Sequence, residues 1–138
     1  MAGADSAADK VVVVTPDQVP WTDNPVIPNA KGAFLVGDPS KAEVTVLRVK
    51  LPPHCKHPPH THPFSEVATV LNGRVGFGLG HVFEPSKGQL YGAGTFAVVP
   101  AQQSHYIWTE DEEAIVQVQF VGPFGIAYVN PSDDPRNR

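Results

Sequence analysis

The chain has 138 residues, the size of one domain, with 41% hydrophobic residues, 17% charged residues and a net charge of -4. This composition is far from that of a disordered chain, and the mild acidity argues against a nucleic-acid partner, which requires a basic face. No apolar run approaches the roughly 20 residues that a membrane span needs, so we expect no membrane partner. A single cysteine excludes an internal disulfide. We expect a cytoplasmic protein, with a removed secretion signal as the alternative.

Prolines and glycines, 15 and 12 residues, interrupt the chain every few positions. This spacing favours short strands joined by turns over long helices. Three parts are expected: a flexible arm and extended strap over residues 1–33, a β domain over 34–130, and a C-terminal tail over 131–138. The strap, TPDQVPWTDNPVIP, contains too many prolines for a strand ladder, and Trp21 is expected to pin it to the domain.

Residues 43–51 alternate as a strand does, with Leu47 and Val49 on one face and Arg48 and Lys50 on the other. Further strands are expected at 95–99, 105–109, 114–121 and 125–129. Short strands at this regular spacing predict an all-β fold, a small antiparallel β-barrel or jelly roll.

Within residues 66–80, Asn72-Gly73 stands between two alternating runs, which predicts a hairpin with a two-residue turn. Its register places three pairs on the inner face: Val70 with Val75, Glu66 with Leu79, and Phe64 with His81. Glu66 therefore points into the core. His81 is expected at the mouth, where it is a candidate catalytic residue that carries protons or holds substrate; the alternative is an ordinary turn histidine.

A carboxylate in a β core is costly unless it is paired or bound to a metal. His60 and His62 share parity with Glu66 on LPPHCKHPPHTHPFSE, which its prolines hold extended. His105, which shares parity with Ile107, is the best third imidazole from another strand. Three imidazoles and one carboxylate suit one divalent transition metal such as iron, manganese, nickel, copper or zinc. The alternative is a polar cluster satisfied by hydrogen bonds.

The remaining polar residues of this segment have weaker candidacies. His57 has the opposite parity to His60 and His62, and both His54 and His57 are expected at the rim or on the surface. Cys55 lies beside Lys56, which could lower the pKa of the thiol, although an unreactive cysteine is the alternative. Gln102 and Gln103 precede His105 and could orient it, or form a solvent-facing turn.

The ligand spacing resembles that of the cupin superfamily. His60-Thr61-His62, followed by Glu66 and Gly73, is similar to the first cupin motif, and Gly94, Pro100 and His105 are similar to the second. The resemblance covers residues 34–129 and implies a small β-barrel that holds a metal through His60, His62, Glu66 and His105, often as a homodimer. The closing GPFGIAYVNPSDDPR resembles one branch of small single-domain cupins.

Two motif glycines are replaced in this chain, by His54 in the first motif and by Gln102 in the second, and Thr109 stands where the second motif has asparagine. We expect His54 to preserve its turn because histidine tolerates left-handed conformations.

From the resemblance, we expect a metal-dependent oxidoreductase of the dioxygenase type acting on a small chelating organic substrate, with Glu66 able to act as a base. Two alternatives stay open. The metal could act as a Lewis acid in an isomerase or lyase, or the protein could be a non-catalytic metal- or ligand-binding cupin.

Overall fold

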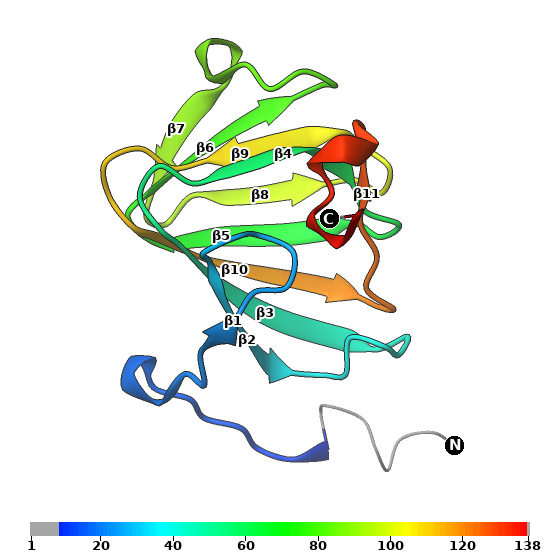
Figure 1. The fold of residues 1–138 in the computed structure, drawn as a ribbon. Coiled ribbons are helices and arrows are strands. Elements are labelled where there is room, and N and C mark those ends of the chain that lie inside the picture. The colour runs from blue at the N-terminus through cyan, green and yellow to red at the C-terminus, as the bar shows by residue number, and fades with distance from the viewer. Residues whose placement is uncertain (1–8, 138) are drawn as a thin grey trace.

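The computed structural model describes residues 9–137, and in this part of the chain eleven strands form two antiparallel sheets (Figure 1). The six-stranded sheet contains, in order, β1 (Thr22–Asp23), β2 (Lys31–Val36), β3 (Val44–Leu51), β10 (Ala114–Val121), β5 (Glu66–Asn72) and β8 (Phe96–Val99). The five-stranded sheet contains β11 (Ala127–Tyr128), β4 (Lys56–Thr61), β9 (His105–Trp108), β6 (Arg74–Leu79) and β7 (Gln89–Gly92). Short 3-10 turns occur at η3 (Pro16–Gln18), η4 (Pro85–Lys87), η5 (Pro131–Asp133) and η6 (Pro135–Asn137).

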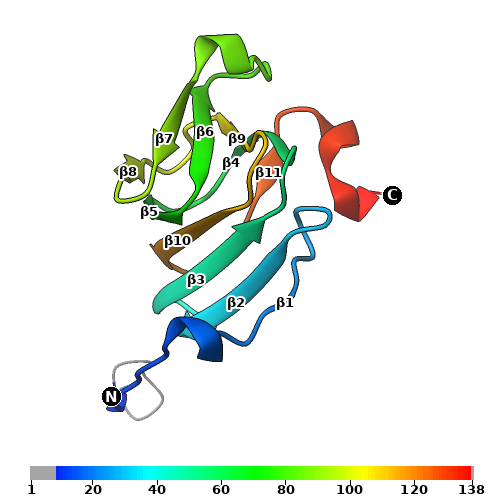
Figure 2. The ribbon, with the colours of Figure 1, turned by 90° about the vertical axis from the view of Figure 1, so that its left-hand side faces the viewer.

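The all-β jelly-roll prediction is confirmed, with two facing sheets in place of a closed barrel. Figure 2 shows the sheets as two layers, with β3 and β10 in one layer and β6 and β9 in the other. The strands expected from the alternating pattern are present as β3, β8, β9, β10 and β11. Among the described residues, none lies in a helix of the length and apolarity needed to cross a membrane.

The hairpin predicted for residues 66–80 is wrong. β5 pairs with β10 and β8, whereas β6 pairs with β7 and β9, so the two strands belong to different sheets. A type I′ turn needs positive φ at both central residues, and only Gly73 has it, at 70°. The chain therefore turns a corner between the sheets at Gly73. Alternation within each strand still directs Val70 and Val75 to the same interior.

The strap is more regular than its prolines predict. Thr22 pairs with Gly32, so β1 adds an edge strand to the six-stranded sheet. The Asn24 side chain accepts hydrogen bonds from the backbone N–H groups of Val26, at 2.8 Å, and Ile27, at 2.9 Å. Ile27 is buried in the core. The expected flexible arm lies mostly in residues 1–8, outside the described residues.

The two faces of the five-stranded sheet carry different side chains. Ile107 of β9 points inward and contributes to a cavity, as its parity with His105 predicts. Tyr106 and Trp108 pack on the opposite face, over the glycines of β6. The Tyr106 hydroxyl donates a 2.6 Å hydrogen bond to the carbonyl of Glu84, which fastens the loop between β6 and β7 to this face. Polar candidate ligands on β9 are thereby separated from its aromatic packing.

Candidate metal site and cavity

Three predicted ligands converge between the sheets. His60 lies in β4, His62 follows that strand, and His105 begins β9, where it pairs with His60. One nitrogen from each of the three rings lies within 4.8 Å of those from the other two. Their exposed fractions are 2%, 7% and 3%. The three imidazoles selected by parity in the sequence thus lie together in the structure.

Each of these imidazoles is oriented by a backbone carbonyl. Nδ1 of His60 lies 2.7 Å from the carbonyl oxygen of Pro58, Nδ1 of His62 lies 2.7 Å from that of Gly125, and Nδ1 of His105 lies 2.9 Å from that of Gln103. A carbonyl can only accept a hydrogen bond, so Nδ1 carries the proton in each neutral ring. Nε2 is then left with a free lone pair, which is the form of histidine that binds metals.

Glu66, the first residue of β5, faces two of these rings. One carboxylate oxygen lies 3.6 Å from Nε2 of His62 and the other lies 3.5 Å from Nε2 of His105. Burial alone would raise the pKa of Glu66, but the nearby His105 and His62 outweigh it and lower the pKa. The carboxylate is therefore ionised at neutral pH.

Burial keeps the His60 and His62 imidazoles neutral. Desolvation is the main cause that lowers the pKa of His60, and the neighbouring His57 and His105 lower it further. Desolvation also lowers the pKa of His62, against the opposing effect of Glu66. Converging imidazole nitrogens beside an ionised carboxylate form a donor set for a cation. These residues therefore fit a divalent transition metal.

His57 lies inside the protein, contrary to the prediction that it lies at the rim. It is 6% exposed, and its ring stacks on that of His60 with a centroid distance of 3.9 Å. The register between β4 and β9 shifts between His57 and His60, at Pro58 and Pro59. This irregularity breaks the alternation, so both histidines point to the same side. Desolvation, followed by the effects of His62 and His105, lowers the pKa of His57 to about 3.

The structure does not bring His81 to the site. Its position was inferred from the hairpin register, which is wrong, and it lies exposed in the loop after β6. Leu79, which the hairpin register places on the inner face opposite Glu66, is 61% exposed. His54 is also exposed, as predicted, and lies 3.6 Å from Asp111. Neither histidine lines the cavity.

The two residues that replace motif glycines adopt the backbone conformation that glycine favours. His54 has φ of 57° and Gln102 has φ of 67°, so both turns survive the substitutions. Gln103 orients His105 through its main-chain carbonyl. Thr109 accepts a 2.9 Å hydrogen bond from the N–H of Cys55 and donates to the carbonyl of Pro52. Burial raises the pKa of the Cys55 thiol, whereas a neighbouring Lys56 was considered as a cause that would lower it.

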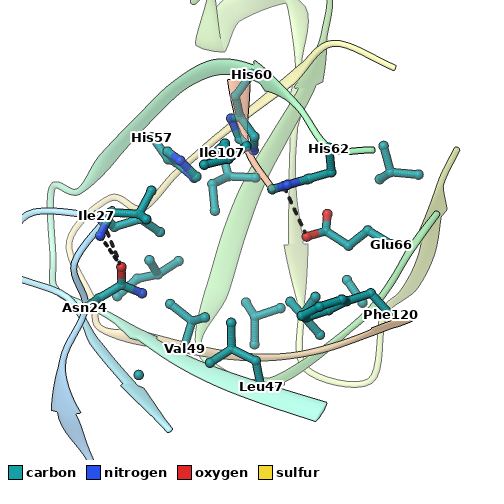
Figure 3. Close-up of a pocket in the computed structure, with 18 of the residues that line it drawn as sticks. Asn24, Ile27, Leu47, Val49, His57, His60, His62, Glu66, Ile107 and Phe120 are labelled. Carbon is teal, nitrogen blue, oxygen red and sulfur yellow. Dashed lines mark hydrogen bonds and ion pairs between the residues drawn. The ribbon is translucent and has the colours of Figure 1, made fainter. Parts of the chain in front are cut away.

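The candidate ligands border a cavity of about 650 Å³ between the sheets. Figure 3 shows His57, His60 and His62 on one wall and Leu47, Val49 and Phe120 on the opposite wall, with Asn24 and Ile27 of the strap at one end. The lining is mostly aliphatic and aromatic. Polar groups that converge on one wall of an apolar cavity are typical of a small-molecule site.

The C-terminal segment completes the site in a way that the sequence pattern did not indicate. Gly125 supplies the carbonyl that orients His62, and the Tyr128 hydroxyl lies 3.0 Å from Nε2 of His57. Phe124 and Ile126 line the cavity. Arg136 holds this segment in place through a 2.9 Å hydrogen bond to the carbonyl of Ile126. These contacts depend on long-range folding, which residue spacing does not report.

The two facing antiparallel sheets with the histidines between them have the fold of a cupin, as likeness to a solved RmlC-like cupin shows. The chain belongs to the family described as a domain of unknown function (DUF4437), whose model matches residues 4–126. No match was found among curated proteins.

Three solved structures illustrate the likeness. The polyketide cyclase RemF from Streptomyces resistomycificus is 20% identical with a TM-score of 0.73, covering 91% of this chain and 90% of RemF. An RmlC-like cupin from Shewanella frigidimarina is 16% identical with a TM-score of 0.63, covering 81% of this chain and 91% of that cupin. An oxalate oxidase is 24% identical with a TM-score of 0.59, covering 78% of this chain and 59% of the oxidase. At these identities the likeness establishes the fold.

Proposed function

We propose that the protein is an enzyme that uses one divalent transition metal, held by His60, His62, Glu66 and His105, to act on a small oxygen-bearing organic substrate. The observation that carries the proposal is the convergence of three carbonyl-oriented imidazoles and an ionised carboxylate on the wall of an apolar cavity. A bound metal would supply Lewis acidity and open positions for substrate oxygens.

The reaction that we propose first is a dioxygenase-type oxidation. The cavity walls around the ligands are apolar, and such surroundings exclude bulk water and protect reactive intermediates. The three imidazoles and Glu66 would hold the metal, and Val49 and Phe120 would enclose the substrate opposite them.

A Lewis-acid reaction without oxygen, as in an isomerase, lyase or cyclase, is the second candidate. Two observations favour it: Glu66 is ionised and lies beside two imidazoles, where it could take a proton from a substrate carbon, and RemF, a cyclase, has this fold over nearly its whole length. Oxygen uptake with a panel of diketones, measured on protein loaded with iron, nickel, manganese or zinc, separates the candidates. Substrate loss without oxygen uptake would favour the second, and no reaction with any metal would contradict both.

The ligand assignment is tested by substitution. His62→Ala removes one nitrogen donor and should weaken metal binding at least about tenfold, measured as metal content after dialysis against a chelator. His81→Ala is the matched control, because this histidine is exposed and distant from the cavity lining, and it should bind as the unaltered protein does. Equal metal loss in both variants would contradict the assignment.

A further inference from the structure

The cavity presents flat apolar surfaces next to the candidate ligands. Phe64, Phe120 and Phe124 form a cluster with ring centroids 4.4 to 6.0 Å apart, and all three line the cavity. The His62 ring stacks on Phe64 with a centroid distance of 5.0 Å and an interplanar angle of 12°. The metal-binding wall therefore continues directly into an aromatic surface, on which planar rings pack favourably.

The cavity offers no positive side chain to a ligand. Among the described lining residues there is no lysine or arginine, and the two carboxylates are Glu66 and Asp23, the second of which is paired with Lys31. A metal would neutralise the oxygens bound to it, but an anionic group elsewhere on the ligand would be buried without a counter-charge. Burial of an unpaired charge is strongly unfavourable. The part of the ligand beyond the metal should therefore be uncharged.

His57 adds a second polar point on the same wall. Among the described residues, Nε2 of His57 has the Tyr128 hydroxyl as its hydrogen-bond partner, and Nδ1 has no partner. No fully buried side-chain nitrogen or oxygen in the described part of the chain lacks a partner, so Nδ1 borders open space. His57 lines the main cavity and also a smaller one of about 190 Å³, which contains Tyr128. Nδ1 is thus a nitrogen without a partner among the described residues, on a ring that lines the main cavity.

We propose that the cavity binds an uncharged, planar, aromatic molecule that bears a chelating pair of oxygens, and that His57, positioned by Tyr128, hydrogen-bonds a further hydroxyl or carbonyl of that molecule. The proposal deepens the proposed function, since the chelating oxygens are those that the metal would hold. It makes His57 the residue that selects substrates by their second oxygen function. It also excludes substrates that carry a charged group beyond the oxygens bound to the metal.

The charge requirement is tested with 2-acetyl-1-naphthol, a neutral chelating hydroxyketone, and with its derivative that carries a carboxylate on the far ring. Calorimetric titration of the zinc-loaded protein should give at least about tenfold tighter binding of the neutral probe, because the remote carboxylate has no partner. The same preference is expected in metal-free protein, with weaker binding of both probes. Equal or tighter binding of the carboxylate would overturn this part of the proposal.

The role of His57 is tested with hydroxylated derivatives of 2-acetyl-1-naphthol, a set of isomers that differ in the position of one additional hydroxyl. For the isomer that binds most tightly, His57→Phe should lower the affinity about tenfold and leave the affinity for the parent naphthol within about twofold. Tyr128→Phe should cause a smaller loss with the same selectivity, since it removes only the hydrogen bond that orients the ring. Metal content is measured in each variant.

The outcomes separate the two levels of the proposal. If the unaltered protein binds no metal, the proposed function fails. If it binds metal but His57→Phe weakens all probes equally, or none, His57 is a packing residue and the inference fails while the proposed function stands.

Discussion

Three histidines of the site share one construction at the scale of the residue. Each donates Nδ1–H to a main-chain carbonyl, those of Pro58, Gly125 and Gln103, and presents Nε2 to the interior. The carbonyls of Pro58 and Gln103 come from the histidines' own segments, whereas that of Gly125 comes from a distant one, so the tautomer of His62 depends on the complete fold. Such hydrogen bonds to metal-binding histidines commonly fix ring orientation and tune metal affinity.

The buried imidazoles predict acid sensitivity of the metal-free protein. The pKa of His57 is lowered from 6.5 to about 3. Between these two pH values the ring is neutral in the folded protein and protonated in the unfolded chain. The stabilisation is complete above pH 6.5 and is lost progressively as the pH falls toward 3. His57→Phe should therefore reduce the dependence of the free energy of unfolding on pH across this interval, measured by urea denaturation.

The control for this prediction is His81→Phe, which changes an exposed position. It should show the same pH dependence as the unaltered protein. A slope that is steeper in His57→Phe, or altered equally in the two variants, would contradict the account.

At the scale of the element, the irregularity of β4 at Pro58 and Pro59 limits which side-chain directions can be predicted from the sequence. Extension of β4 placed His60 and His62 correctly, because alternation holds from residue 60 onward. The same counting failed for His57, since the irregularity at the two prolines reverses the parity. The Asn72-Gly73 turn was misread for a similar reason: the positive φ at Gly73 was predictable, but the assignment of β5 and β6 to different sheets depends on distant partners such as β10 and β9.

Glycines in β6 make room for the aromatic face of β9, and this predicts a local stability effect. A Cβ at Gly76 would overlap the indole of Trp108, which is packed and 6% exposed. Gly76→Ala should lower the free energy of unfolding by about 1–3 kcal/mol, as overpacking does. The measurement is chemical denaturation monitored by tryptophan fluorescence.

Gly92→Ala is the matched control, because the nearest atom to its added Cβ would be the Arg74 Cγ at 3.9 Å. It should change stability far less than Gly76→Ala. Equal effects would indicate that the strand propensity of alanine, and not contact with Trp108, determines the change in stability.

On the scale of the whole molecule, the cavity is assembled from segments that are far apart in sequence. Both sheets, the strap at Asn24 and Ile27, and the C-terminal segment at Phe124 and Ile126 contribute to its walls. The convergence of three histidines was predictable from local spacing, but the volume of the cavity and the absence of lysine and arginine from its described lining were not. The homodimer and the cytoplasmic location stay predictions.

The central claim is that three imidazoles and one carboxylate surround a single metal ion. X-ray absorption spectroscopy of the metal-loaded protein tests it most directly. The account predicts one ion per chain with three imidazole nitrogens in its shell, and two in the His105→Ala variant. An ion bound without imidazole scattering, or a shell unchanged by His105→Ala, would contradict it.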